Sequence, residues 1–383
     1  MSDTWMTRET ALFRGGPQQR NFREMAMIHP SRRITRSAHP RPLPVASGFE
    51  LPETFEFENA SVDTEAFLES VQTTGLMVVR DGTCLFQQHM EGYAPGTQTI
   101  SFSVAKSFIS TLIACALRDG HIRDIEDPVD RYAPALAGSG YAGVALRDVL
   151  QMSSGVRWNE DYADPKSDVA RFAAAFERGQ SFDAVAASLP REHVPGTFNR
   201  YNSCDTHVLG MVLAGATEVS VSEYLERELW HPLGMEDDCF FLVDGEGVEA
   251  AAMGMNASLR DYAKLGLLFL NDGFCGERQI LPDGWVEACR TATLPHLKPG
   301  KRPNADYPFG YSYQWWLPDE SGAFTAIGVY YQFIWIDRAS GCVIAKTSAD
   351  ARFGRDNHET ERIEQMHFAL FNGIATDVSD HHI

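Results

Sequence analysis

Runs of β-forming residues stand near both ends of this chain, and the part between them is mainly helical. Residues 76–93 contain two such runs on either side of Asp81-Gly82, a dipeptide typical of hairpin turns. Residues 324–348 contain two more, separated by the turn-forming residues 338–341. A chain of 383 residues is long enough for one large domain or two lobes. We therefore predict one sheet assembled from distant segments, with a helical lobe inserted between them.

The same pattern divides the chain into three predicted parts. Residues 59–125 and 255–383 form a discontinuous α/β sheet lobe, and residues 126–254, with short helical segments and turn clusters, form a helical lobe. Residues 1–58 are rich in arginine and proline and show no periodicity, so we interpret them as an irregular arm draped over the body. Its arginines are expected to pair with the acidic surface of the protein itself and not with nucleic acid.

Charge and cysteine content exclude several classes of partner. The chain has 33 lysine and arginine residues against 52 aspartate and glutamate residues, a net charge of −19 that repels a phosphate backbone. Its 7 cysteines are widely spaced and form no metal-binding motif, so we expect neither a disulfide framework nor a metal. No stretch approaches about 18 apolar residues. We therefore expect a cytoplasmic protein with no nucleic-acid or membrane partner, and leave a homodimer open.

A buried helix is predicted over residues 103–120 (SVAKSFISTLIACALRDG), because apolar residues surround most of its circumference. Its first turn contains Ser103 and Lys106, whose i, i+3 spacing places both side chains on one face. A serine hydroxyl becomes a nucleophile when a neighbouring base takes its proton, and burial lowers the pKa of a lysine so that it can be that base. The helix N-terminus supplies N–H groups that stabilise an oxyanion.

A short motif such as Ser103-x-x-Lys106 also arises by chance. The structural alternative is a capping serine followed by a lysine whose amine reaches solvent. Against it, the helix is almost wholly apolar, and no acidic residue between positions 100 and 118 is available to pair with the lysine. This context favours a catalytic interpretation.

Two further segments are candidates for the same chemistry. Tyr201-Asn202-Ser203 precedes an apolar helical run, and a tyrosine there can relay protons because its hydroxyl both donates and accepts. In Ala326-Ile327-Gly328-Val329, which leads into a predicted strand, the glycine allows a backbone to approach a ligand closely. Taken singly, such a tyrosine is more often structural, and a glycine bulge explains the second segment equally well.

Together the three segments resemble one family. Their order matches the SxxK, YxN and KTG motifs of the serine β-lactamase and penicillin-recognising superfamily, and the resemblance spans roughly residues 60–372. Five further stretches resemble its class C-like esterase and amidase branch: residues 146–158, 195–210, 231–238, 258–273 and 310–317. The resemblance implies an α/β (α+β) fold of the β-lactamase type, in which an antiparallel sheet is flanked by helices and joined to a mainly helical second lobe.

Carried over to this sequence, the resemblance implies the roles of four residues. Ser103 is the nucleophile and Lys106 the general base, while Tyr201 passes protons to the leaving group and activates water. The backbone N–H groups of Ser103 and Val329 form the oxyanion hole, because Val329 follows the glycine that ends the family's KTG triplet.

The departures from the family motifs concern the substrate. Ser203 replaces the asparagine of YxN, and Ala326-Ile327 replaces the lysine and threonine of KTG. In β-lactamases that lysine helps to bind a substrate carboxylate, so its loss removes a charge-assisted contact worth roughly 1.5–3 kcal/mol. Efficient turnover of penicillins is therefore not expected, and an uncharged site suits esters and amides, including short oligomers.

Aromatic residues are expected to line the cleft. Tyr311, Tyr313 and Trp315 alternate along one predicted strand, although sheet-core packing is at least as good an interpretation for Trp315 and Trp316. Tyr330 and Tyr331 flank the oxyanion position, and Trp158, Glu160 and Tyr162 are candidates for the opposite wall. The predicted substrate-binding residues are Ser203, Gly328, Tyr330, Tyr331, Tyr313, Trp158 and Tyr162.

The sequence thus predicts a serine hydrolase that acts on a small-molecule amide or ester through a Ser103 acyl-enzyme, without a cofactor. Within the same superfamily, a β-lactamase or D,D-peptidase is the alternative. Transfer of the acyl group to an acceptor other than water is a further one, because the acceptor depends on whether the cleft excludes water. A non-catalytic scaffold is disfavoured, because the serine, lysine and tyrosine are all present.

Overall fold

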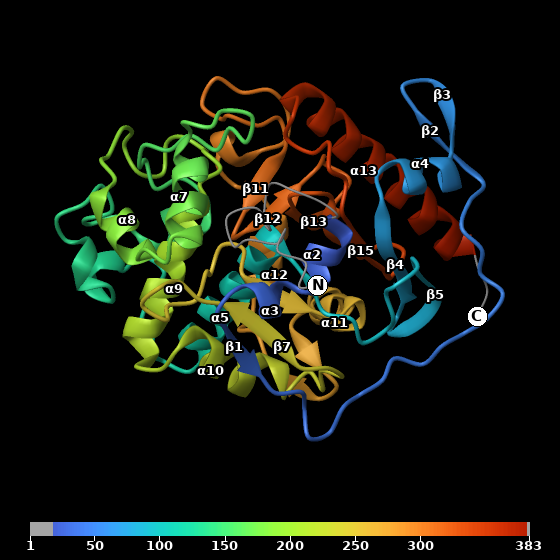
Figure 1. Ribbon diagram of the computed structural model, residues 1–383, viewed down its shortest axis with the longest axis horizontal. Coiled ribbons are helices and arrows are strands. Elements are labelled where there is room, and N and C mark those ends of the chain that lie inside the picture. Colours follow the sequence, from blue (N-terminus) through green and yellow to red (C-terminus); the bar gives the residue numbers. More distant parts are fainter. Residues whose placement is uncertain (1–17, 381–383) are drawn as a thin grey trace, which may run out of the picture.

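Strands from the two ends of the chain meet in one seven-stranded antiparallel sheet. The computed structural model describes residues 18–380 and orders the strands β11-β12-β13-β14-β15-β4-β5 (Figure 1). At the junction, β15 pairs with β4 so that Val343 lies opposite Val79. Both predicted hairpins, β4-β5 and β14-β15, are confirmed. The strands are β4 (Thr73–Arg80), β5 (Thr83–His89), β11 (Gly310–Ser312), β12 (Trp315–Leu317), β13 (Phe324–Gly328), β14 (Gln332–Asp337) and β15 (Cys342–Ser348).

Helices cover both faces of this sheet (Figure 1). Alternate residues of a strand point to opposite faces, so Met77 and Val79 join the core beneath α11 (Leu259–Leu270), whereas Leu76 and Val78 join the core beneath α13 (Asn357–Asp380). Burial on both faces explains why β4 is a continuous apolar run instead of an alternating one.

The predicted buried helix is confirmed as α5 (Ala105–Arg118), preceded by the 3₁₀ turn η1 (Phe102–Val104). Every residue from Ala105 to Ala116 is buried, and α5 packs against α9 (Ser203–Thr217), a second interior helix. A further helix, α11, begins after Ser258, whose side chain accepts a hydrogen bond from the Asp261 backbone N–H. These interior helices fix the ends from which the candidate catalytic side chains project.

The middle of the chain is mainly helical, as expected, with one exception. Its elements are η2 (Val129–Arg131), η3 (Pro134–Leu136), α6 (Leu146–Leu150), α7 (Asp168–Glu177), α8 (Phe182–Ser188), α9, α10 (Val221–Leu225) and the π-helix η4 (Glu226–Trp230). The exception is β7 (Cys239–Leu242), which belongs to a four-stranded sheet of order β1-β7-β8-β6 with β8 (Met255–Ala257) and β6 (Thr99–Ile100). The boundaries between the lobes stay a prediction.

The expectation of an irregular arm over residues 1–58 is wrong for part of it. Residues 1–17 lie outside the described residues, but β1 (Ser31–Ile34) pairs with β7, and α2 (Gln18–Arg23) and α3 (Met25–Ile28) precede it. The sequence of β1 hides the strand because only Ile34 is buried, so no apolar alternation is visible.

Smaller elements complete the described chain. They are β2 (Thr54–Phe57), β3 (Ala60–Asp63), α4 (Thr64–Ser70), β9 (Phe274–Cys275), β10 (Arg278–Gln279), α12 (Trp285–Arg290) and η5 (Pro295–Leu297). Within residues 18–380, no single helix is long and apolar enough to cross a membrane; α9 and Val221–Trp230 meet that criterion only as a pair bent by 78°.

Candidate active site

Ser103 and Lys106 lie together where η1 runs into α5. The Lys106 Nζ atom is 2.9 Å from Ser103 Oγ, 3.1 Å from Ser203 Oγ and 2.9 Å from the Ala252 carbonyl oxygen. The lysine side chain is buried, with 2 % of its surface exposed. The two side chains that the sequence places on one helical face are therefore in direct contact, away from bulk water.

Burial changes the proton affinity of this lysine. Loss of hydration lowers the pKa of Lys106 to about 8, and the nearby negative charge of Glu160 partly opposes that shift. At this pKa roughly a tenth of the lysines are neutral at pH 7, compared with fewer than one in a thousand at the ordinary value. The pair can therefore act as a nucleophile and a general base near neutral pH.

The residue before Ser103 has a left-handed backbone. Phe102 has φ 45°, a conformation that is costly for a side chain of this size. Its ring packs against those of Phe22 and Tyr330, with centroid distances of 5.0 and 5.3 Å. The N-terminal arm thus helps to hold the turn that carries Ser103.

Tyr201 reaches the same place from the start of α9. Asn202 caps this helix by accepting hydrogen bonds from the Cys204 and Asp205 backbone N–H groups, which fixes the preceding residue. The Tyr201 ring stacks on Trp316 at a centroid distance of 4.9 Å, and Lys106 Nζ lies 5.2 Å from the ring centroid. These contacts hold the phenol beside the Ser103–Lys106 pair.

The Tyr201 phenol is held in its neutral form. Burial raises its pKa well above the ordinary value and the charge of Glu160 adds to the rise, while a hydrogen bond with Ser103 opposes it. A neutral hydroxyl both donates and accepts a proton, whereas this buried tyrosine is a poor source of phenolate. A neutral phenol in this position can relay a proton.

The end of β13 lies against the nucleophile turn. A Cβ atom at Gly328 would clash with the Ser101 carbonyl oxygen, so only glycine allows this approach. Val329, the next residue, lines the cleft beside Ser103. The predicted pair of oxyanion donors, the N–H groups of Ser103 and Val329, therefore comes from two segments that the structure brings side by side.

These residues open into a cleft of about 780 Å³ with an acidic lining. Its acidic residues are Glu160, Asp161, Asp168, Glu192, Asp306, Glu361 and Glu364. Burial raises the pKa of Glu364 to about 8, so this one is mostly neutral at pH 7. The two lining arginines are already paired: Arg200 bonds to Glu192 and Asp306, and Arg157 lies 3.6 Å from Asp168. Negative charge therefore dominates the cleft, which opposes the binding of anionic groups.

The predicted wall residues Trp158 and Tyr162 do line the cleft. Both donate a hydrogen bond to the carboxylate of Glu160, from Trp158 Nε1 and from the Tyr162 hydroxyl at 2.7 Å. Ser203 joins this group, since its hydroxyl donates to Glu160 over 2.6 Å. Residues 158–162 are thus connected to Lys106 through Ser203.

The expectation that Tyr330 and Tyr331 line the cleft is wrong. Both have positive φ, 64° and 67°, and form a tight turn between β13 and β14, and neither is among the residues that line the cleft. The rings pack against Phe353, at centroid distances of 5.3 and 5.2 Å, and Phe353 is the residue that lines the cleft. The sequence did not predict this turn, because neither residue is glycine or asparagine, the residues typical of tight turns between strands.

The expectation for Tyr313 is also wrong, for a similar reason. Residues 310–317 form a hairpin and not one strand, because Tyr313 and Gln314 have φ of 44° and 67° and reverse the chain. Tyr313 packs against Trp285 at a centroid distance of 5.0 Å, away from the cleft. Core packing, the alternative given for Trp315 and Trp316, is confirmed for both, and Trp316 also lines the cleft.

Sequence reasoning missed several other lining residues, of which Glu364 on α13 is chemically the most distinctive. Loss of hydration and the neighbouring charge of Glu361 raise the pKa of Glu364 to about 8. Helical periodicity in α13 gave no signal for this residue, because a polar position on an amphipathic helix ordinarily faces solvent.

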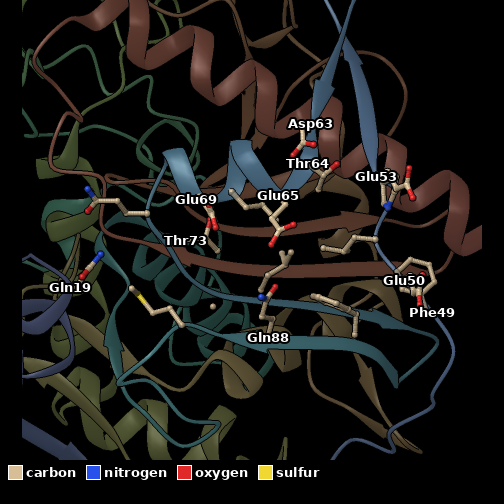
Figure 2. Close-up of a pocket in the computed structure, with 18 residues that line it drawn as sticks. Gln19, Phe49, Glu50, Glu53, Asp63, Thr64, Glu65, Glu69, Thr73 and Gln88 are labelled. Atoms are coloured by element: carbon tan, nitrogen blue, oxygen red, sulfur yellow. The ribbon is translucent and has the colours of Figure 1, made fainter.

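A second cavity of about 800 Å³ lies between α4, the β4-β5 hairpin and residues 49–53 (Figure 2). Figure 2 shows that Glu50, Glu53, Glu65 and Glu69 are among its lining residues, which also include the apolar residues Leu68, Leu76 and Phe86. None of its described lining residues is a serine, cysteine, lysine or histidine, so this cavity lacks the groups that acyl transfer needs. Across residues 18–380, no group of three His, Cys, Asp or Glu side chains is placed to share a metal ion.

Comparison with known proteins gives one family. The family model for beta-lactamases matches residues 64–366 of this chain. The 6-aminohexanoate-dimer hydrolase of Paenarthrobacter ureafaciens is 30% identical over 296 residues, which cover 75% of this chain and 75% of the relative.

Solved structures show the same fold. A Bacillus anthracis protein provisionally named 6-aminohexanoate-dimer hydrolase superposes with a TM-score of 0.87 at 21% identity, over 99% of this chain and 98% of its own. The hydrolase EstCE1, described as having promiscuous acyltransferase activity, superposes with a TM-score of 0.63 at 15% identity, over 82% of this chain and 96% of its own. The predicted antiparallel sheet with flanking helices and a helical region is confirmed.

Proposed function

Because this chain belongs to the beta-lactamase family of hydrolases, we propose that it cleaves amide or ester bonds through an acyl-enzyme formed on Ser103. The observation that carries the proposal is the 2.9 Å contact between Ser103 Oγ and the buried Lys106 Nζ. In this scheme, Ser103 Oγ attacks the carbonyl carbon of the substrate while its proton passes to the neutral amine of Lys106.

The oxyanion of the tetrahedral intermediate is then bound by the backbone N–H groups of Ser103 and Val329. Tyr201 donates its proton to the leaving alcohol or amine as the bond to that group breaks, and recovers a proton from the Lys106 ammonium. In the second half of the reaction, water attacks the acyl-enzyme and gives its proton to Tyr201. Tyr201 passes a proton to Lys106, and Lys106 returns one to Ser103 Oγ as the acyl bond breaks. Each turnover therefore returns all three side chains to their starting protonation states.

The charge of the cleft indicates the substrate class. Position 326 holds alanine where the related β-lactamases carry the lysine of KTG, and the lining carboxylates outnumber the paired arginines. A substrate with a carboxylate near β13 is therefore disfavoured, and a neutral or cationic amide or ester is favoured. The curated relative is named for an amide dimer of an amino acid, and a cleft of about 780 Å³ has room for a short linear oligomer.

The test compares wild type with two serine variants of the same helix. Wild type is expected to hydrolyse p-nitrophenyl acetate and to gain the mass of a serine-reactive fluorophosphonate, whereas Ser103→Ala should lose both activities by at least about 10³-fold. Ser110→Ala is the matched control, because Ser110 is a buried serine of α5 whose hydroxyl has no partner among the described residues. Activity or labelling that survives in Ser103→Ala would overturn the proposal.

The alternative of a β-lactamase or D,D-peptidase is tested on the same samples. Nitrocefin carries a carboxylate, and we expect its kcat/KM to lie well below that of a neutral ester of similar reactivity. A kcat/KM for nitrocefin above that of the neutral ester would favour the alternative.

A further inference from the structure

The carboxylate of Glu160 is buried and receives hydrogen bonds from four donors. Two come from its own segment, Trp158 Nε1 and the Tyr162 hydroxyl at 2.7 Å. The other two come from Ser203 at the start of α9, whose backbone N–H lies 3.0 Å away and whose hydroxyl lies 2.6 Å away. With 7 % of its surface exposed, Glu160 is held as an acceptor on both oxygens.

This arrangement fixes the direction of the Ser203 hydroxyl. Because that hydroxyl gives its single proton to Glu160, its lone pairs are left to face Lys106 Nζ at 3.1 Å. The same amine lies 2.9 Å from Ser103 Oγ. A continuous line of contacts therefore runs from the nucleophile through the lysine and the serine to a buried carboxylate.

We propose that Glu160 is a positioning residue for the Lys106 base: through the Ser203 hydroxyl, its carboxylate fixes the amine beside Ser103 and stabilises the ammonium formed when Lys106 takes the Ser103 proton. The inference rests on the proposed function, because it concerns the residue that positions the proposed base, Lys106. The O–H bond of Ser103 breaks and an N–H bond forms on Lys106, while no proton moves to Glu160.

Other ionisable groups around Glu160 do not supply this charge. Burial raises the pKa values of Tyr162, Tyr201, Tyr307 and Tyr311 well above their ordinary range, so these phenols stay neutral. The thiol of Cys204 is likewise held neutral by burial.

One further carboxyl, Asp205, lies on α9 close to Glu160. Its pKa is raised to about 7 by burial, and it is held by hydrogen bonds from Tyr141, Ser154 and Asn202 instead of any contact with Lys106. Glu160 is the charged group that raises the pKa of Lys106 against the effect of burial.

The charge of Glu160 therefore predicts a change in pH profile. In Glu160→Gln, the ammonium form of Lys106 loses its counter-charge, so the pKa of Lys106 falls. The acid limb of the pH–rate profile therefore moves to lower pH. The amine also becomes a weaker base and is less firmly placed, so the rate on the plateau falls. A purely structural carboxylate would change the rate at every pH without moving the midpoint.

The experiment measures the second-order rate of fluorophosphonate labelling of Ser103 from pH 5.5 to 9.5. For Glu160→Gln we expect a midpoint lower by about one pH unit and a plateau lower by about tenfold. Asp161→Asn is the matched control: it removes a carboxylate from the next residue of the same cleft wall, one that bonds to Asn357 and Ala163 and not to Ser203. Its midpoint should equal that of wild type.

Ser203→Ala provides a second variant in case Glu160→Gln does not fold, which circular dichroism and thermal unfolding would reveal. It keeps the carboxylate but removes the bridge, and should label several-fold more slowly than wild type. A wild-type midpoint in a folded Glu160→Gln, an equal shift in Asp161→Asn, or wild-type labelling in Ser203→Ala would each overturn the inference. Failure of wild type itself to label at Ser103 would instead overturn the proposed function.

Discussion

At the scale of single residues, the site depends on one lysine that is kept out of water. Lys106 has three polar contacts, with Ser103, Ser203 and the Ala252 carbonyl. The charge that opposes the effect of burial on its pKa is that of Glu160. Desolvation is the larger effect, so the amine loses its proton more readily than a lysine at the surface. Ser203, which replaces the asparagine of the family motif, takes part in the same contacts.

The pKa of Lys106 predicts how the rate depends on pH. The base is active when neutral, and its neutral fraction increases as pH rises, so kcat/KM for a neutral ester should rise about tenfold per pH unit below about 8 and level off above it. The pKa of Tyr201 is raised well above its ordinary value. The phenol therefore keeps its proton up to pH 9.5 and adds no second slope to the pH–rate profile.

The measurement is the kcat/KM of p-nitrophenyl acetate from pH 5.5 to 9.5 at constant ionic strength, corrected for spontaneous hydrolysis. A limb centred near 6.5, the ordinary pKa of histidine, would indicate a different base.

At the scale of elements, the N-terminal arm packs against the turn that carries Ser103. Phe22 of α2 is fully buried and packs on Phe102 and Tyr330, with centroid distances of 5.0 and 4.9 Å. Phe102 has a left-handed backbone, which persists only where the surrounding packing holds it. A segment that sequence patterns described as irregular is therefore part of what shapes the active site.

Truncation of Phe22 should lower both stability and activity. Phe22→Ala removes a buried ring and is expected to cost about 3–5 kcal/mol of unfolding free energy. It should also slow the labelling of Ser103 several-fold, since Phe102 loses its support. Urea unfolding and fluorophosphonate labelling in native buffer give the two readouts.

Met27→Ala is the control for the arm, because Met27 lies on α3 with 78 % of its surface exposed and should change neither quantity. If Phe22→Ala is destabilised but labels at the wild-type rate, the arm supports the fold and not the nucleophile turn.

At the scale of the whole molecule, negative charge characterises both the chain and its cleft. The net charge is −19, and the cleft itself is lined by an excess of carboxylates. Such a field raises the local concentration of cations and lowers that of anions, and dissolved salt screens it over a Debye length of about 10 Å at 0.1 M.

This field predicts a salt-dependent preference. Two p-nitrophenyl esters of matched length, of 6-aminohexanoate and of adipate, differ at one end in an ammonium or a carboxylate. At 20 mM NaCl, we expect kcat/KM for the cationic ester to exceed that for the anionic one by about tenfold or more, and the ratio to fall toward one at 500 mM NaCl. A ratio below one at low salt would show that the acidic lining does not determine which of the two esters is hydrolysed faster.

The sequence by itself predicted the elements whose signal is local. Apolar runs around Asp81-Gly82 and residues 338–341 predicted both hairpins, and the apolar circumference of residues 103–120 predicted α5. The spacing of Ser103 and Lys106 placed them on one helical face, where the structure has them in contact. These features need only the regular geometry of a helix or a strand.

Only the tertiary structure decided how distant segments meet. The rings of Tyr330 and Tyr331, in the turn between β13 and β14, pack on Phe353 instead of lining the cleft, and β1 is a strand because β7 lies beside it. The bond from Ser203 to Glu160 and the burial of Lys106 likewise join segments far apart in the chain. Backbone pairing, ring packing and loss of hydration depend on which surfaces come together, and no local pattern of residues contains that information.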